Sequence, residues 1–576
     1  MRAFHLPLYI LISLLLFSGS CKKDEYRGRE VIDLSEQEWY LWPDTAARWK
    51  NDKLFLPPVK TDDLPVNPPS KGWENIYEQG KEIQIPATVE KYYWNKNEKK
   101  PGMEGDYKGV SWFVTRIHLP QDLNDKIIRL SFQSVRQRAE IFINRKLAGY
   151  DCIGNSKFVI DISDHLKFGE KNEIAVRITD PGGKLACNGP TTYSWNQTIL
   201  PESNGFGGIT GKLKQLITEK TFIQDVFIKN KPSIRDVEAQ VTLVDSIPCQ
   251  PYGKLVFSVF PKNTENIIFT DTVSIQFRKQ VNKLDKLIQI PQARLWWPDD
   301  PFLYTLRVEW MGKNGRYDRL IKDFGFRWFD FKEKNGQKMI FLNHQRKFLL
   351  SAESKGFWPV NGIFPTNEQL DKQMESLRKL GLNTLHYQGF AGREALLNKA
   401  DEKGLMVSIE PGDYLSHLPD SGKAAFQQKL SEIKLIRMIK ELRNHPSLIY
   451  YSMQHLKAEK PSQRDINDIK KAHKTDPTRY IFYSYHTGQT QSSGQQPINC
   501  HCTNTPSYSK LNMEPYQHIL NHFGFCYECC TGDKSVYHDT LYNKPDNYYL
   551  HSRHQNEITI FEDQGAKGTI SNIKKI

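Results

Sequence analysis

Hydrophobic and polar residues alternate along much of the chain between about residues 30 and 219. The alternating hydrophobic positions include Ile128, Leu130, Phe132, Ile174, Val176 and Ile178. Short stretches of period two that are separated by Gly, Asn and Pro turns are typical of an antiparallel β-sandwich. The same pattern recurs between about Phe222 and Phe324, and it predicts a second, smaller sandwich.

The period of the hydrophobic pattern changes after about Phe331. Leu370, Met374, Leu377 and Leu380 mark one helical face after a capping-box sequence, and Gly381 ends that helix. Further helices are predicted at Glu394–Lys403 and around 426–439, with short strands at 383–386, 405–409, 448–451 and 480–483. Alternating strands and helices over about 250 residues predict a (β/α) barrel with a parallel sheet.

The first 20 residues have the pattern of a secretory signal. Arg2 and His5 precede an apolar run from Leu6 to Phe17, and small residues lead to Cys21. This arrangement resembles a bacterial lipoprotein cleavage site, so Cys21 is the expected lipidated residue and 21–29 a linker. A plain secretory signal is the alternative. The prediction is an exported lipoprotein of the outer membrane or periplasm, reaching the cell surface if the charged residues 22–25 act as a sorting tag.

Composition and charge exclude several functional classes. Lys and Arg number 79 against 66 Asp and Glu, which gives a formal net charge of +13, but the basic residues are dispersed and form no nucleic-acid motif. We expect no cofactor, because no phosphate-binding Gly loop and no Gly-x-Ser-x-Gly sequence occurs. Five cysteines lie between 500 and 530, and we expect structural thiols or a disulfide there rather than a metal site.

Several sequence stretches together resemble glycoside hydrolase family 2. They are Tyr107–Trp112, Arg138–Asn144, Leu295–Pro298, Phe324–Arg327, Ala400–Leu405 and Arg443–Ser447. The resemblance implies a jelly-roll sugar-binding domain at 30–220, an immunoglobulin-like sandwich at 221–325 and a TIM-type barrel at 326–576. The expected fold class is therefore multidomain β plus α/β, with an incomplete (β/α)8 barrel.

The resemblance also locates the two carboxyl groups of a retaining glycosidase, which stand about 5–5.5 Å apart in such enzymes. The acid/base Glu of the family falls on Leu456, and the preceding Asn falls on His455. Glu459 could rescue the acid/base role if its loop were re-routed. The nucleophile position falls on Asp563, although Glu562 is adjacent and the alignment could be off by one residue.

Other residues resemble positions that line the substrate pocket of the family. His386 ends the second predicted strand of the barrel, Glu410 ends the third, and Trp358 lies in a loop that could reach the same face. His455 belongs to the same group. Purely structural roles remain open for each of them.

The resemblance places Asp563 at the end of the seventh barrel strand, and the chain ends soon afterwards. The last βα unit of the barrel is therefore expected to be absent. The tail could close the barrel, a partner chain could complete it, or the gene could be truncated or split. Three functions follow: a glycan-binding scaffold with impaired hydrolysis, an active retaining exo-β-glycosidase of the β-galactosidase or β-glucuronidase type, or a fragment of a longer enzyme. The expected ligand is a glycan or oligosaccharide, and the expected membrane contact is the lipid anchor.

Overall fold

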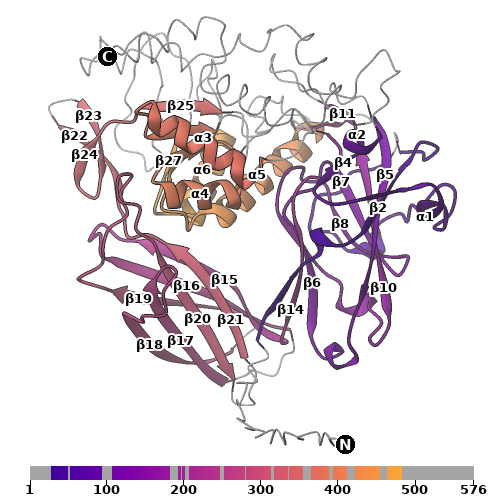
Figure 1. Cartoon of the computed structure of the whole chain (residues 1–576), viewed down its shortest axis with the longest axis horizontal. Coiled ribbons are helices and arrows are strands. Elements are labelled where there is room, and N and C mark those ends of the chain that lie inside the picture. The colour runs from indigo at the N-terminus through magenta and orange to yellow at the C-terminus, as the bar shows by residue number, and fades with distance from the viewer. Residues whose placement is uncertain are drawn as a thin grey trace, which may run out of the picture.

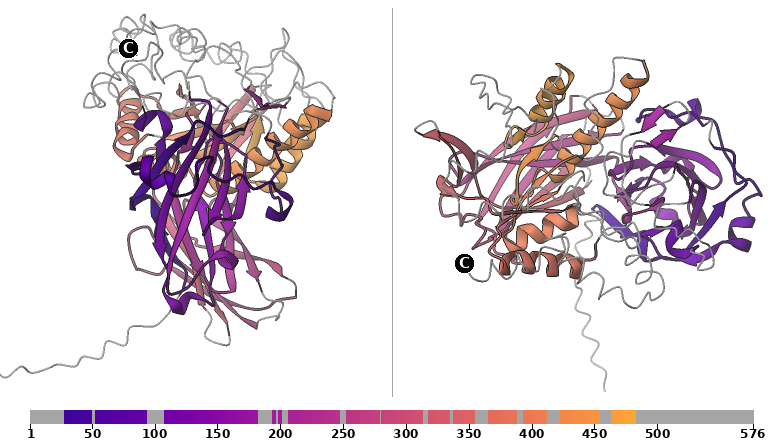
Figure 2. Two further views of the ribbon diagram at one scale, coloured as in Figure 1. Left: turned by 90° about the vertical axis from the view of Figure 1, so that its right-hand side faces the viewer. Right: turned by 90° about the horizontal axis from the view of Figure 1, so that it is seen from above.

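The computed structural model describes residues 28–49, 52–93, 107–181, 193–195, 198–200, 206–246, 252–278, 280–312, 317–334, 337–354, 365–387, 393–411, 422–453 and 463–482. Two β-sandwiches come first along the chain, and a parallel sheet with helices follows them (Figure 1). Seen from above, the helices and the parallel sheet lie beside the first sandwich (Figure 2). This order confirms the predicted fold class.

The first sandwich has a four-stranded and a six-stranded antiparallel sheet. The smaller sheet has the order β1 (Glu30–Asp33), β14 (Leu213–Thr218), β6 (Ile127–Phe132) and β9 (Phe158–Asp161). The larger sheet has the order β3 (Lys81–Ile83), β2 (Trp39–Asp44), β5 (Gly109–His118), β10 (Lys171–Asp180), β7 (Arg138–Ile143) and β8 (Lys146–Asp151). The alternating residues recognised in the sequence, such as Leu130 and Val176, fill the space between the sheets.

Short elements complete this sandwich. They are η1 (Leu34–Glu36), η2 (Thr61–Asp63), α1 (Asn75–Gln79), β4 (Ala87–Thr88), α2 (Val89–Tyr92), η4 (Gln121–Leu123), η5 (Ser163–His165), β11 (Tyr193–Trp195), β12 (Thr198–Leu200) and β13 (Gly208–Ile209). β13 pairs with β4, and Gly208 approaches the backbone of Ala87 so closely that a Cβ atom there would lie 2.1 Å from its carbonyl oxygen. Only glycine fits such an approach.

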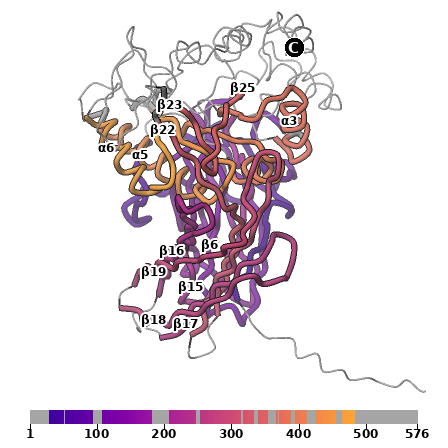
Figure 3. The backbone as a smooth tube through the Cα atoms, turned by 90° about the vertical axis from the view of Figure 1, so that its left-hand side faces the viewer, coloured from indigo at the N-terminus to yellow at the C-terminus, as the bar shows by residue number. Residues whose placement is uncertain are grey.

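The second sandwich has a three-stranded and a four-stranded sheet. The first has the order β15 (Thr221–Asn230), β16 (Asp236–Asp245) and β19 (Val281–Gln289). The second has the order β18 (Phe269–Gln276), β17 (Tyr252–Pro261), β20 (Tyr304–Gly312) and β21 (Tyr317–Phe324). Its strands lie at the opposite end of the molecule from the parallel sheet (Figure 3).

The third unit is a five-stranded parallel sheet with four helices. The strands follow the chain in the order β25 (Ser351–Ser354), β26 (Thr384–Tyr387), β27 (Met406–Ile409), β28 (Leu448–Ser452) and β29 (Tyr480–Phe482). The helices are α3 (Asn367–Lys379), α4 (Glu394–Lys403), α5 (Gly422–Leu442) and α6 (Gln463–Thr475). A three-stranded sheet of β22 (Phe329–Lys334), β23 (Gln337–Leu342) and β24 (Gln345–Lys347) precedes β25.

The sequence analysis missed several of these elements. β25, α6 and the sheet β22–β24 were not predicted, because β25 is polar and α6 has an apolar stripe of only three residues. The helix predicted around 426–439 was also expected to have a single apolar face, and this expectation was wrong, because α5 has two. Phe426, Leu430 and Ile433 pack against the first sandwich, whereas residues such as Leu435 and Ile439 pack against the parallel sheet.

Candidate active site

Side chains of the parallel strands divide between two faces of the sheet. Leu385, Val407 and Ile409 are buried among the side chains of the helices. The residues between them point to the opposite, inner face, because successive side chains of a strand alternate. One row of paired positions crosses this inner face: His386, Ser408, Tyr450 and Tyr480.

His386 and Glu410 meet at the carboxyl ends of β26 and β27. Nε2 of His386 lies 3.4 Å from Oε1 of Glu410, and Nδ1 of the same ring lies 2.8 Å from Oγ of Ser408. The backbone N–H of Glu410 donates to the carbonyl of Tyr387, which extends the ladder by one residue. The side chain of His386 is 22% exposed and that of Glu410 is 4% exposed, so the imidazole is the more accessible of the two.

The other half of the inner face is covered by aromatic side chains. Phe331 of β22 lies edge-on to Tyr480 and Phe482 of β29, with ring centroids 4.8 and 5.2 Å apart. The hydroxyl of Tyr480 donates to Asp330 over 2.5 Å. Because this packing fills the space over β28 and β29, the described polar surface of the inner face lies over β26 and β27.

The Arg443–Ser447 segment is a junction between domains. Asn444 accepts from the backbone N–H of Ile228 and donates to the carbonyl of Val226, each over 2.8 Å, and Arg443 forms an ion pair with Asp225. These partners belong to β15 of the second sandwich. The segment is therefore structural and does not reach the carboxyl ends of the strands.

Buried charges stabilise the amino ends of the same strands. Arg327 donates to the carbonyls of Pro446 and Leu448, and Arg479 pairs with Asp476 over 2.8 Å. Burial lowers the pKa of Arg327 to about 9, and the charge of Arg479 contributes to this shift. Burial alone would raise the pKa of Asp476, but Arg479 and hydrogen bonds from neighbouring residues hold it below its usual value.

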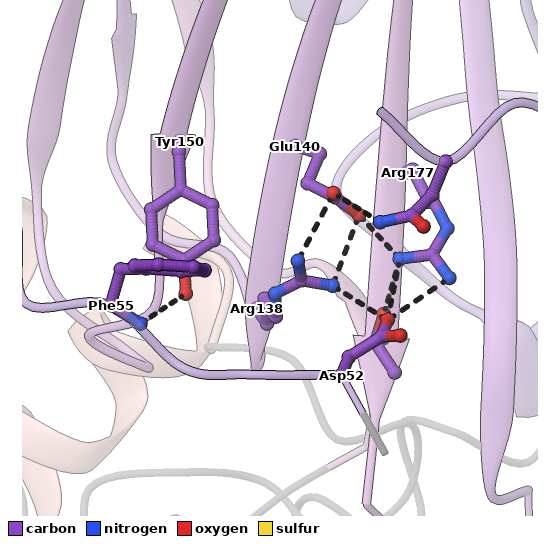
Figure 4. A network of polar contacts seen from close by, with 8 residues as sticks. Asp52, Phe55, Arg138, Glu140, Tyr150 and Arg177 are labelled. Carbon is purple, nitrogen blue, oxygen red and sulfur yellow. Dashed lines mark hydrogen bonds and ion pairs between the residues drawn. The ribbon is translucent and has the colours of Figure 1, made fainter. Parts of the chain in front are cut away.

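A second polar network lies on the outer face of the six-stranded sheet. Figure 4 shows Asp52 and Glu140 between the guanidinium groups of Arg138 and Arg177. Asn67 also donates to Glu140 over 2.9 Å. Two cations face two anions within the described residues, and this balance fastens the segment from Asp52 to Asn67 onto the sheet.

The structure places only two of the residues that were predicted for the site. His386 and Glu410 are brought together, with Nε2 of the ring 3.4 Å from Oε1 of the carboxylate. Cys21, Trp358, His455, Leu456, Glu459, Asp563 and the cysteines between 500 and 530 lie outside the described residues. Cys152 is a free, buried thiol, and the described residues contain no cluster of three or more metal-ligating side chains.

The sequence analysis did not identify Ser408 or Tyr450 as members of the inner row. Ser408 is the single polar residue in a buried apolar strand, and this exception was the signal that could have identified it.

Comparison with known proteins agrees with this geometry. The family model "Glycosyl hydrolases family 2" matches residues 221–327, which span the second sandwich. A putative β-glucuronidase of Formosa agariphila is 24% identical over 82% of the chain and 53% of its own length. A β-galactosidase of Thermoanaerobacter pseudethanolicus is 25% identical over 65% of the chain and 48% of its own length. The crystal structure of a putative β-galactosidase from Bacteroides fragilis superposes with a TM-score of 0.63 at 19% identity, covering 85% of this chain and 70% of that one.

The chain therefore resembles the proteins of glycoside hydrolase family 2. The structure of a β-glucuronidase from Bacteroides uniformis shares the fold with a TM-score of 0.60 at 19% identity, over 80% of this chain and 53% of that one. The family 2-like chain spans about half the length of the curated relatives it matches. Within its described part, no helix combines the length and apolar character that crossing a membrane requires.

Proposed function

We propose that the family 2-like chain binds an uncharged glycan over β26 and β27 and hydrolyses it poorly or not at all. The observation that carries this proposal is the His386–Glu410 pair at the carboxyl ends of the strands, the end at which barrels of this kind hold their substrates. The carboxyl group of Glu410 can accept hydrogen bonds from sugar hydroxyls. The family comparisons support a carbohydrate as the ligand.

The charge of the inner face supports a neutral sugar. Its described positions on β26 to β29, together with Glu410 directly after β27, include one glutamate and one histidine, and they include no lysine or arginine. A uronate would bring a second carboxylate next to Glu410, and like charges at short range repel each other. We therefore expect a galactoside or glucoside to bind more tightly than the matching uronide.

Impaired hydrolysis is proposed because Leu456 falls on the acid/base position of the family. A hydrocarbon side chain cannot protonate the departing oxygen, and a general acid contributes about 10²–10⁴-fold to the rate. Asp563 at the nucleophile position is one methylene shorter than Glu, and a misplacement of about 1 Å can cost about a hundredfold.

Export as a lipoprotein is part of the same proposal, because the first 21 residues have the expected pattern. Cys21→Ser should leave the chain soluble after cell fractionation, whereas the wild type sediments with membranes. Equal fractionation of the two proteins would exclude the lipid anchor.

The enzymatic test uses chromogenic β-galactoside, β-glucoside, β-mannoside and β-glucuronide substrates with the full-length chain. We expect turnover near background for the wild type and a gain of about 10²-fold for Leu456→Glu, with Leu456→Gln as the matched control. Calorimetry with the corresponding neutral and acidic sugars measures binding. The wild type could instead turn over substrate at ordinary enzyme rates and lose this activity in Glu459→Gln or Asp563→Asn. That result would establish an active retaining exo-β-glycosidase, an alternative supported by relatives that are named β-galactosidase and β-glucuronidase.

A further inference from the structure

Ser408 occupies an unusual position for a polar residue. It lies in β27 between the buried residues Val407 and Ile409, and its own exposure is 0%. Its side chain is directed to the inner face, where it meets the ring of His386 on the paired position of β26. A buried hydroxyl cannot touch a sugar itself, so any role in binding must act through the imidazole.

We infer that Ser408 is a positioning residue, whose hydroxyl donates to Nδ1 of His386 and thereby holds the ring proton on Nε2, facing Glu410. This inference rests on the proposed glycan site, for which it names a further residue. The three groups form one chain, because Ser408 lies 2.8 Å from Nδ1 and Glu410 lies 3.4 Å from Nε2.

The direction of the hydrogen bonds follows from the chemistry of the three groups. A neutral imidazole carries one N–H and one acceptor nitrogen. If Nδ1 carried the proton, the lone pair of Nε2 would face the oxygens of Glu410, and two acceptors would oppose each other. If Nε2 carries the proton, it faces an acceptor, and Nδ1 accepts the proton of the Ser408 hydroxyl.

This arrangement fixes how the pair meets a ligand. The Nε2 proton is then directed at Oε1 of Glu410, which fixes the orientation of the imidazole that a sugar meets. Without the Ser408 donor, the ring can exchange its tautomer or take up a second proton. Either change alters the charge and the hydrogen-bonding pattern that a sugar encounters.

The direct test is nitrogen-15 NMR of histidine-labelled full-length protein at pH 7, with the His386 signals assigned by their loss in His386→Asn. We expect the wild type to show a neutral ring protonated on Nε2. Ser408→Ala should move the Nδ1 signal toward a mixed or doubly protonated state, and Ser408→Thr should restore it. Ser447→Ala is the matched control, because Ser447 is equally buried and its hydroxyl has no hydrogen-bond partner among the described residues.

Binding of a neutral glycoside supplies the second measurement. We expect Ser408→Ala to weaken binding about fivefold, as the loss of one neutral hydrogen bond predicts, while Ser408→Thr and Ser447→Ala stay near wild type. A wild-type ring protonated on Nδ1, a doubly protonated ring, or a Ser408→Ala spectrum identical to wild type would overturn the inference. The NMR spectra are recorded without glycan, so they test the role of Ser408 independently of binding. If the wild type bound no glycoside, the proposed function would be contradicted, and the NMR result alone would decide the role of Ser408.

Discussion

The carboxyl groups of Asp476 and Glu90 are both buried, but the two regions around them differ in the hydrogen bonds that they donate to the carboxyl group. Asp476 precedes β29 and accepts hydrogen bonds from Arg479, from the hydroxyl and backbone N–H of Thr478, and from Tyr451. Glu90 belongs to α2 of the first sandwich, and within the described residues no side chain donates a hydrogen bond to its carboxyl oxygens. The backbone N–H groups of Glu90 and Tyr107 and the charge of Arg136 offset its burial only in part.

The pKa directions express this difference. The partners of Asp476 outweigh its burial and hold its pKa below the usual value. Burial raises the pKa of Glu90 well above its usual value, and the charge of Asp180 adds to the shift. A buried carboxyl with a full set of partners therefore stabilises its region, whereas one without partners costs free energy whenever the unfolded chain would be ionised.

Asp476→Asn should give the largest effect on stability. The substitution keeps the size of the side chain but leaves Arg327 and Arg479 without the anion between them, and breaking a buried charge network costs about 3 kcal/mol or more. Urea unfolding at pH 7, followed by circular dichroism, measures the loss. Asp299→Asn is the control, because the side chain of Asp299 is exposed, and an equal effect of both variants would refute the assigned role.

The same pair of proteins tests the sign of the pKa shift. A lowered pKa contributes stability that is complete above the unfolded value, about 3.8, and is lost as the pH falls through the folded value. The difference between the wild type and Asp476→Asn should be constant from pH 7 to about pH 5. It should shrink on further acidification, and a difference that grows there would contradict the shift.

The two regions also show what the sequence could predict. Helix α4 lies at Glu394–Lys403 as predicted. Gly404 ends it by adopting a positive φ of 72°, and the helical pattern and the terminating glycine can both be recognised from neighbouring residues in the sequence. The partners of Asn444 lie more than 200 residues earlier in the chain, so no local pattern could identify the segment around it as a domain junction.

In the candidate site, too, some features could be predicted from local sequence and others depend on residues that are distant in the chain. His386 and Glu410 were predicted because they end predicted strands and resemble positions that line the substrate pocket of the family. The contact of His386 with Ser408 depends on the register between β26 and β27, which hydrophobic periodicity does not determine. For the same reason no local sequence pattern indicated that Glu90 is buried, since the charged residues near it, Arg136 and Asp180, come from distant parts of the chain.

Glu90→Gln should change stability in the opposite direction. The amide has the shape of the protonated acid and carries no proton to lose, so the variant avoids the cost of keeping Glu90 neutral at pH 7. We expect a gain in stability at that pH, because burial raises the pKa of Glu90 in the folded chain and the unfolded chain is ionised there. The gain should grow with pH above about 4.5, toward the raised pKa of the folded state, and vanish below it.

The matched control for this variant is Glu82→Gln, because Glu82 is exposed on strand β3 of the same sandwich. Thermal melts between pH 4 and pH 8 measure both variants against the wild type. A destabilised Glu90→Gln at pH 7, or a gain independent of pH, would show that Glu90 is ionised in the folded chain and that the comparison with Asp476 does not hold.

Tyr451→Phe should give the smallest effect and shows whether the partners of Asp476 act separately. The Tyr451 hydroxyl donates to Asp476 over 2.9 Å, and its removal leaves the contacts with Arg479 and Thr478 in place. We expect a loss of about 1 kcal/mol in the free energy of unfolding, measured in urea, which is the usual value of one hydrogen bond.

A Tyr451→Phe, Asp476→Asn double variant tests whether the hydroxyl acts through Asp476. The loss caused by Tyr451→Phe should be smaller in this background, because the amide is a weaker acceptor than the carboxylate. Strict additivity of the two losses would mean that the hydroxyl stabilises the sheet without acting through the charge of Asp476.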